Sequence, residues 1–246
     1  MNDLLKIERG LKMRKIISTE PIISFATNVT YYLNDCEICK EEIKKNFLSI
    51  FKDDEKLRDE FIDSLTLVKK ELDADLAFFM ESDPAADSED QIIFAYPGYR
   101  AITFYRIAHL INNLGFRFEA RVISEHAHFL TGIDIHPGAT IGSPFFIDHG
   151  TGIVIGETAV VGDHVKIYQG VTLGALSLGK GAKLKGTKRH PTVGNYVTIY
   201  SGASILGGDV VIGNNVVIGS NVCLMESVGD NHRVILPKPD LMIIKK

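Results

Sequence analysis

Residues Ile153–Gly174 read IVIGETAVVGDHVKIYQGVTLG, and this stretch repeats every six residues. Aliphatic side chains stand at Ile155, Val161, Ile167 and Leu173, and glycine directly follows three of the four. A period of six fits neither an α-helix, which repeats about every 3.6 residues, nor a plain β-strand, which repeats about every 2. It is typical of a hexapeptide β-helix, in which each unit forms one flat face and turns one corner. The sequence therefore predicts a parallel β-helix with its aliphatic residues pointing inward.

The repeat extends from Ile135 to Leu224 and slips at three places. The slips, with spacings of eight, twenty and seven residues, lie between Ile147 and Ile155, between Leu173 and Val193, and between Ile205 and Ile212. Stacked coils close their core without insertions, so inserted residues tend to serve a function on the surface. The first slip holds His149 and the second ends near His190. Both histidines are therefore candidates for a functional site.

Composition narrows the class of protein. The chain has 246 residues and a formal net charge of −4, and this lack of basic excess argues against binding to nucleic acid or to an anionic membrane. We find no apolar run of about 18 residues that would cross a membrane, and the first residues do not resemble a signal peptide. The three cysteines, with Cys36 and Cys39 in a C-x-x-C pattern, are too few for a disulfide framework. We expect a cytoplasmic protein in which this pair lies on a helix.

The first 130 residues have the spacing of helices rather than of the repeat. Their apolar residues recur at intervals of three and four, which predicts helices over 54–80, 98–114 and 117–130. Gly115 is a plausible helix stop. We therefore predict an α + β fold with three parts: an all-α domain at 1–130, a β-helix at 131–236 and a tail at 237–246.

A histidine and a carboxylate are expected to meet near the start of the β-helix. Because Ile135 points inward, alternation directs Asp134 and His136 outward. Asp134 and His149 are fifteen residues apart and a coil holds about eighteen, so the first slip is expected to place them on neighbouring faces. A carboxylate beside an imidazole fixes its tautomer and raises its basicity, which favours a general base. The alternative is a surface pair without a catalytic role, with His136 serving only the domain junction.

The second slip ends in the sequence Lys188-Arg189-His190-Pro191. Arg189 suits a carboxylate, because a guanidinium donates two parallel hydrogen bonds. Residues 179–188 carry four lysines among glycines, which suits the phosphates of a ligand, although a solvated loop would have the same composition. A zinc site needs about three convergent ligands. The histidine spacings give no such trio, so we expect no metal.

Several motifs together resemble the serine acetyltransferase family. They are Asp134-Ile-His-Pro, Asp148-His149-Gly-Thr-Gly-Ile, Gly156-Glu-Thr-Ala-Val, Gln169-Gly-Val-Thr-Leu-Gly and Arg189-His190-Pro191, preceded in the helical part by Asp83-Pro84-Ala85, Gly98-Tyr-Arg-Ala and Tyr105-Arg106-Ile107-Ala-His109. The likeness covers roughly residues 83–221. It implies transfer of the acetyl group of acetyl-CoA to L-serine, giving O-acetyl-L-serine for cysteine biosynthesis. It also implies a left-handed β-helix, an exception to the right-handed crossover rule.

The resemblance implies a role for each matching residue. His149 would take the proton of the serine hydroxyl, and Asp134 would orient its ring. The implied binding residues are Asp83 and Asp148 for the ammonium group of serine, Arg189 and His190 for its carboxylate, and Ala175, Ser201 and Ser220 for acetyl-CoA. We expect Lys180 and Lys183 of the lysine-rich loop to add positive charge near the phosphates of the coenzyme.

The resemblance also concerns assembly and partners. The family forms trimers through its β-helices, often paired into hexamers through the helical domains, with the coenzyme in a groove between subunits. L-cysteine carries the same ammonium and carboxylate groups as L-serine, so it is expected to compete. The loop before Arg189 is longer than usual, and Tyr200 and Ser201 stand where the family shows small residues. The segment Pro237–Lys246 lacks the Gly-x-Pro-Ala-Arg motif with which the family docks onto O-acetylserine sulfhydrylase, so the sequence does not support that docking.

Two other functions stay open at the level of sequence. An acetyltransferase of the same repeat class could act on another hydroxyl or on an amine, but a sugar acceptor needs no carboxylate clamp such as Arg189. A non-catalytic β-helix scaffold would share the repeat alone, and the expected pairing of Asp134 with His149 argues against it. The sequence therefore favours a serine O-acetyltransferase.

Overall fold

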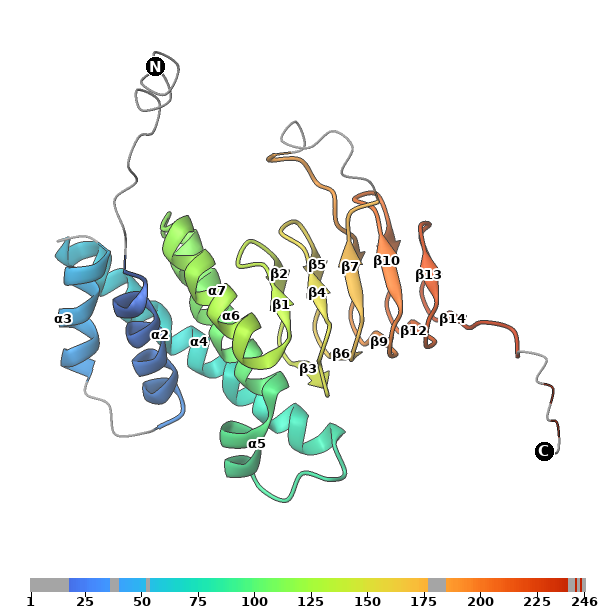
Figure 1. The fold of residues 1–246 in the computed structure, drawn as a ribbon, viewed down its shortest axis with the longest axis horizontal. Coiled ribbons are helices and arrows are strands. Elements are labelled where there is room, and N and C mark those ends of the chain that lie inside the picture. Colours follow the sequence, from blue (N-terminus) through green and yellow to red (C-terminus); the bar gives the residue numbers. More distant parts are fainter. Residues whose placement is uncertain are drawn as a thin grey trace, which may run out of the picture.

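The computed structural model describes residues 18–35, 40–51, 54–176, 185–238, 242 and 244. In this part of the chain six helices come first and short strands follow (Figure 1). The helices are α2 (Glu20–Leu33), α3 (Lys40–Ile50), α4 (Glu55–Ser82), α5 (Glu89–Ala95), α6 (Pro97–Asn113) and α7 (Arg117–Thr131). The predicted α + β order is confirmed. The C-x-x-C pair at Cys36 and Cys39 lies outside the described residues.

The strands form three parallel sheets. Sheet A contains β1 (Asp134–Ile135), β4 (Val154–Ile155), β7 (Thr172–Gly174), β10 (Ser204–Leu206) and β13 (Cys223–Leu224). Sheet B contains β2 (Thr140–Ile141), β5 (Val160–Val161), β8 (Thr192–Val193) and β11 (Val211–Ile212). Sheet C contains β3 (Phe145–Asp148), β6 (Val165–Tyr168), β9 (Thr198–Ile199), β12 (Val217–Ile218) and β14 (Arg233–Val234). The chain visits A, B and C in turn, so each passage is one coil of a left-handed β-helix. We call its three edges the A–B, B–C and C–A corners.

The register of sheet A locates the insertions. Asp134 pairs with Val154, Val154 with Thr172, Thr172 with Ser204, and Ser204 with Cys223, which are steps of 20, 18, 32 and 19 residues. The extra residues relative to a step of 18 agree with the three slips in the repeat. They enter the C–A corner between β3 and β4, the A–B corner between β7 and β8, and the A–B corner between β10 and β11.

Aliphatic residues of the repeat fill the interior of the β-helix, which has the shape of a three-sided prism. All thirteen of them, from Ile135 to Leu224, are at most 8% exposed. Burial of one such side chain contributes about 1.5–3 kcal/mol. The period of six therefore identified the core of this domain correctly, since every position it selected is buried.

The helices end where their sequences predict. α4 begins after Asp54, whose carboxylate accepts the N–H of Leu57 at 3.1 Å, and it ends at the residue before Asp83. α6 ends before Gly115, which has a φ of 95° in the left-handed region that glycine tolerates. The predicted helices over 54–80, 98–114 and 117–130 correspond to α4, α6 and α7.

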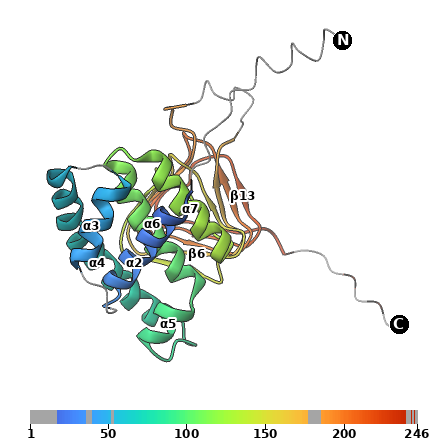
Figure 2. The same cartoon turned by 60° about the vertical axis from the view of Figure 1, so that its left-hand side comes forward.

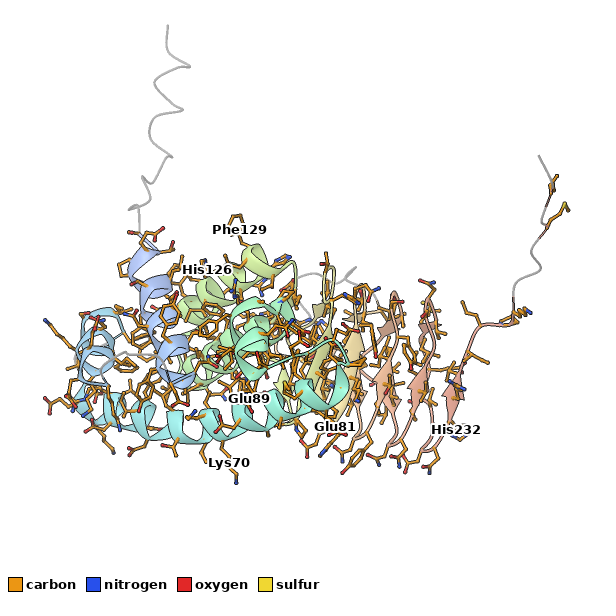
Figure 3. All side chains as sticks on the ribbon, turned by 90° about the horizontal axis from the view of Figure 1, so that it is seen from below. Lys70, Glu81, Glu89, His126, Phe129 and His232 are labelled. Atoms are coloured by element: carbon orange, nitrogen blue, oxygen red, sulfur yellow. The ribbon has the colours of Figure 1, made fainter. Side chains whose placement is uncertain are left out.

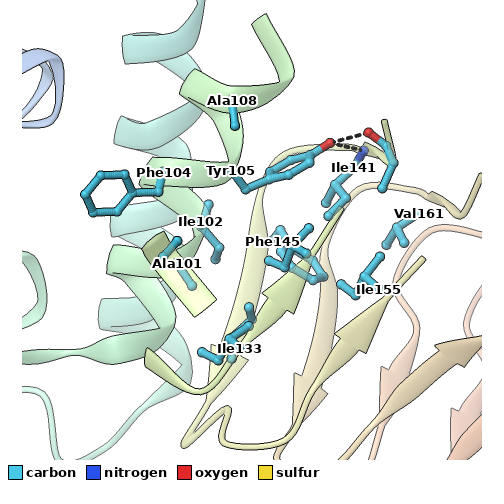
Figure 4. Packing of buried hydrophobic residues seen from close by; sticks show 14 of the residues in the cluster. Ala101, Ile102, Phe104, Tyr105, Ala108, Ile133, Ile141, Phe145, Ile155 and Val161 are labelled. Atoms are coloured by element: carbon cyan, nitrogen blue, oxygen red, sulfur yellow. Dashed lines mark hydrogen bonds between the residues drawn. The ribbon is translucent and has the colours of Figure 1, made fainter. Parts of the chain in front are cut away.

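Side chains of α6 dock the helical domain onto the first coil. The Tyr105 hydroxyl donates to the Ala139 carbonyl at 2.7 Å and accepts the N–H of Ile141 at 3.1 Å (Figure 4). His109 Nδ1 donates to the Pro137 carbonyl at 2.8 Å. The tyrosine-to-histidine motif of α6 thus binds the backbone of the first coil. Figure 2, in which the helical side comes forward, shows the helices stacked over one end of the β-helix.

Candidate active site

His149 lies in the C–A corner between β3 and β4, and its side chain is 73% exposed. This corner stacks on the preceding coil, because the Gly152 N–H donates to the Gly132 carbonyl at 2.8 Å. Later coils place Ser201 and Ser220 in the same corner, with their hydroxyl oxygens 3.3 Å apart. The structure thus lines up the candidate base and two candidate coenzyme residues along one edge of the prism.

One carboxylate lies beside His149, and a second acts on the same tyrosines from the helical part. Asp148 Oδ1 lies 3.5 Å from His149 Nε2. Asp83 comes from the end of α4 and accepts a hydrogen bond from the Tyr96 hydroxyl at 2.7 Å. This hydrogen bond, together with burial and the charges of Asp83 and Asp148, raises the pKa of Tyr96 to about 12. Burial and the same two charges also raise the pKa of Tyr168, which is in register with Asp148. Asp83 and Asp148 therefore act on the same small region although they belong to different domains.

The two carboxylates suit a cation. Among the described residues, no lysine or arginine forms an ion pair with Asp83 or Asp148. Two ionised carboxylates that lie close together repel each other, and an ammonium group between them would relieve this repulsion. An amino group bound there would lie next to the imidazole of His149. The arrangement can therefore hold an amine beside a base.

Asp134 does not bond to His149 in this chain. Its nearest ionic partner is Arg121, with Nη1 4.0 Å from Oδ1. Both residues are described, and no hydrogen bond joins them. The turn of His149 stacks on Gly132 and Ile133, one coil before, so the ring lies near the start of β1 but projects into solvent. The expected pairing is not formed here, and the orienting role of Asp134 stays a prediction.

A second polar cluster lies in the A–B corner. The Arg189 guanidinium pairs with the Glu157 carboxylate, and this hydrogen bond, followed by the charge of Arg189, lowers the pKa of Glu157. The Thr158 hydroxyl oxygen accepts the backbone N–H groups of Arg189 at 2.9 Å and His190 at 3.1 Å. Glu157 and Thr158 thus hold the two residues expected to bind a carboxylate.

His190 is held as a neutral ring with a defined tautomer. Its Nδ1 accepts the Thr158 N–H at 3.0 Å and lies 2.9 Å from the Thr158 hydroxyl, which has already accepted two N–H groups and so donates its own proton. The proton of the neutral ring is then on Nε2. Burial, with the charge of Arg189, lowers the pKa of His190 to about 4. His190 can therefore donate one uncharged N–H to a ligand.

One chain does not bring these two clusters together. His149 precedes β4 at the C–A corner, whereas Glu157 and Thr158 follow β4 at the A–B corner. The strand and its sheet separate the two edges. The expected ammonium site and the expected carboxylate site of serine therefore lie on different edges of the same prism.

The expected coenzyme residues are only partly described. Ala175 directly follows β7, where the long insertion leaves the A–B corner. Lys180 and Lys183 lie outside the described residues. Lys188, at the end of the same loop, donates to the Thr158 carbonyl at 2.7 Å and the Pro191 carbonyl at 3.2 Å. Its ammonium group thus holds the end of the loop in place.

Neither a metal site nor a membrane-spanning helix is found among the described residues. No group of three or more histidine, cysteine, aspartate or glutamate side chains there could hold a metal ion. No helix in the same residues is long and apolar enough to span a bilayer.

Comparison with known proteins identifies the family. No family model matches the chain. The plasmid serine acetyltransferase of Synechococcus elongatus is 53% identical over 149 residues, which are 59% of this chain and 47% of that relative. The chain spans about half the length of the first curated relatives it matches. The solved structure of Entamoeba histolytica serine acetyltransferase 1 in complex with L-cysteine has a TM-score of 0.75 at 37% identity, covering 90% of this chain and 88% of that one.

The chain belongs to the serine acetyltransferase family. The resemblance predicted from the sequence motifs is thereby confirmed. A second serine acetyltransferase structure, that of Neisseria gonorrhoeae in complex with serine, has a TM-score of 0.68 at 30% identity and covers 91% of this chain and 85% of its own.

The sequence did not predict roles for several residues of this candidate site. Tyr96 bonds to Asp83, and Tyr168 lies in register with Asp148, yet neither was singled out. Glu157 and Thr158 belong to a motif named above, but only the structure shows that they hold Arg189 and His190. The signal that could have found them is the motif itself, because a polar Glu-Thr pair at a corner of the repeat needs partners.

Proposed function

We propose that this chain is a serine O-acetyltransferase, which transfers the acetyl group of acetyl-CoA to the hydroxyl of L-serine and releases CoA. The observation that carries the proposal is that two carboxylates act on the same tyrosines, Tyr96 and Tyr168: Asp83 from the end of α4, and Asp148, which lies beside His149 in the C–A corner. A free amino acid needs an anionic site for its ammonium group next to the base that acts on its side chain. A scaffold without catalytic activity would have no use for such an arrangement.

The proposed chemistry is direct transfer in a ternary complex. His149 takes the proton of the serine hydroxyl while the oxygen attacks the thioester carbonyl. The new bond joins that oxygen to the acetyl carbon, and the bond from this carbon to the CoA sulfur breaks. The imidazolium then returns its proton to the leaving thiolate. No metal and no covalent enzyme intermediate takes part in this scheme.

The carboxylate of serine is the proposed ligand of Arg189 and His190. Because these residues lie on the A–B corner, the site is completed when a neighbouring chain packs its A–B corner against the C–A corner of this one. A trimer of β-helices, or two such trimers joined through their helical domains, would meet that need. Arg189 would supply charge and His190 a neutral Nε2–H, which suits a carboxylate.

Acetyl-CoA is the proposed co-substrate, bound along the corner that carries Ser201 and Ser220. Ala175, Lys180 and Lys183 are the other proposed contacts, and the lysines would offset the phosphate charge. We further propose that L-cysteine occupies the serine site and inhibits, since it has the same two charged ends. Its presence in the Entamoeba histolytica relative supports this. A cytoplasmic location and a place in cysteine biosynthesis complete the proposal, and docking to O-acetylserine sulfhydrylase forms no part of it.

One assay tests the reaction. Thiol release from acetyl-CoA is measured with a panel of acceptors that includes L-serine, D-serine, ethanolamine, a hexose and an amino sugar. The proposal requires release that depends on L-serine and falls when the ammonium or the carboxylate is removed from the acceptor. Equal release with a sugar, or release only with an amine, would favour another member of the acetyltransferase class.

A further inference from the structure

A buried ion pair connects two helices where the helical domain meets the β-helix. Asp75 of α4 is 0% exposed and Arg106 of α6 is 4% exposed. Arg106 Nε donates to Asp75 Oδ2 at 2.7 Å, and Nη2 donates to Oδ1 at 2.9 Å, so the pair is bidentate. Taking two charges out of water is costly, and an apolar pair of the same size is often as stable. The pair therefore calls for a role besides stability.

The same two side chains also bind the β-helix. Asp75 Oδ1 accepts the N–H of Phe145 at 2.8 Å. The Ser143 hydroxyl lies 3.0 Å from the Glu71 carbonyl and 3.3 Å from Asp75 Oδ1, so its single proton is shared between these two acceptors. Arg106 Nη2 donates to the Gly142 carbonyl at 3.0 Å. The Asp75 carboxylate thus bonds to α6 through Arg106 and to the first residue of β3 through the N–H of Phe145.

Two segments of similar length, which we call the two arms, lead from the Asp75–Arg106 pair to the proposed ammonium site: the end of α4 and strand β3. Along α4, Asp83 is eight residues beyond Asp75, a rise of about 12 Å. Along β3, Asp148 is three residues beyond Phe145, a rise of about 10 Å. The arms pack together between their ends, with the rings of Phe79 and Phe146 4.7 Å apart. Figure 3 shows Glu81, near the end of α4, on the side of the helices that meets the strands.

We propose that Asp75 and Arg106 are positioning residues that set the separation of Asp83 from Asp148. The inference rests on the proposed function, because that separation decides how well an ammonium group is held. The packing of aromatic rings along the two arms resists separation but tolerates small slides. The bidentate pair and the Phe145 hydrogen bond have fixed directions, so they fix the position of α4 along β3.

The test compares Asp75→Asn with wild type in the full chain. The variant keeps the shape of the side chain and removes its charge, which weakens its hold on Arg106. We expect KM for L-serine to rise about ten-fold, since a misplacement of about 1 Å can cost up to about 100-fold in activity. KM for acetyl-CoA should stay unchanged, because the corner with Ser201 and Ser220 is not touched. Asp73→Asn is the matched control: Asp73 lies on the same helix and pairs at the surface with Lys69 at 3.3 Å.

The split between the two KM values distinguishes positioning from stability. A purely structural pair would lower the folded fraction, so kcat per chain would fall while both KM values stayed the same, and this result would overturn the inference. Ser143→Ala is a milder second variant. It removes the hydroxyl that lies 3.0 Å from the Glu71 carbonyl and 3.3 Å from Asp75, and we expect it to raise KM for serine about two- to three-fold. If Asp75→Asn does not fold, an unchanged serine KM in Ser143→Ala overturns the inference. Wild type is assayed first: absence of serine-dependent thiol release would remove the proposed function itself, a different outcome from release with unchanged KM values.

Discussion

At the scale of single residues, the charge of His190 is controlled by its neighbours. Thr158 directs both its N–H and its O–H at Nδ1, so protonation of that nitrogen would break two hydrogen bonds. The charge of the proposed carboxylate clamp then comes from Arg189 alone, while His190 contributes direction. The contribution of this clamp to serine binding should for this reason change little with pH near neutrality.

The neutral His190 ring should also make stability depend on pH. The ring takes up its proton only near pH 4 in the folded chain, whereas an unfolded histidine does so near its ordinary value of 6.5. The unfolded chain therefore binds more protons between these values, and folding is weakened as pH falls through that window. We expect this residue to contribute a loss of about 2–3 kcal/mol in the free energy of unfolding. Urea unfolding at pH 6.5, 5.5 and 4.5 measures it, and His190→Asn should show a smaller loss. The same pH dependence in both proteins would contradict the neutral ring, and exposed His232→Asn is the control.

His149 should be essential for turnover. Replacing it with alanine removes the proposed base, and we expect kcat to fall by about two to four orders of magnitude with little change in acetyl-CoA binding. The residue has a φ of 56°, a conformation that asparagine tolerates better than alanine. His149→Asn therefore removes the base without adding backbone strain, and it should lose kcat to the same extent. Near-normal turnover in either variant would exclude His149 as the base.

Only part of this site was predictable from the sequence. His149 and Arg189 were found because they stand beside slips in a regular repeat. The role of Asp83 came from the family resemblance, since nothing local shows that the end of α4 meets β3. No hydrogen bond joins Asp134 to His149 here, and their pairing stays a prediction, because spacing along a coil predicts which residues are neighbours and not where a side chain on a corner points.

At the scale of elements, a ladder of side chains holds the B–C corner. Asp163 accepts the backbone N–H of Ser143, Asn195 that of Asp163, Asn214 that of Asn195, and Asp230 that of Asn214, all at 2.7–3.0 Å. Each acceptor serves the coil before its own. The period of six predicted the coils but not this ladder, because the hydrophobic pattern carries no information about polar residues at the corners.

Removing one hydrogen bond of this ladder should lower the stability of the β-helix. Asn195→Ala leaves the N–H of Asp163 without its acceptor at 2.8 Å, and we expect a loss of about 1 kcal/mol because water can reach this exposed corner. Chemical denaturation gives the value. Asp209→Ala, an exposed residue on the following turn, is the comparison and should change stability by less. Equal effects would mean that the ladder adds nothing to folding.

At the scale of the whole molecule, the helical domain and the β-helix both contribute residues to the proposed site. The domain order and the helices were predictable because each element has its own hydrophobic period. The docking of α4 and α6 was not, since it depends on Tyr105, Arg106 and His109, whose partners are backbone groups of a coil about 30 residues away in sequence. The hydrophobic period of a segment shows which of its side chains are buried. It does not show which other segment they pack against.

The separation of the two polar clusters gives the last prediction. In a trimer with sites between chains, one chain supplies His149 and its neighbour supplies Arg189. A variant with His149→Ala and another with Arg189→Ala should each be nearly inactive, because every site in either homotrimer lacks one group. When the two are co-expressed in equal amounts, a site is intact if it takes its C–A corner from the Arg189 variant and its A–B corner from the His149 variant. Random assembly makes about a quarter of the sites intact, so we expect about a quarter of wild-type turnover.

Purified homotrimers mixed without exchange of chains should stay inactive, which is the control. The co-expressed pair could instead be no more active than the average of the two single variants. The site would then be completed within one chain, and the proposed arrangement of neighbouring corners would be wrong.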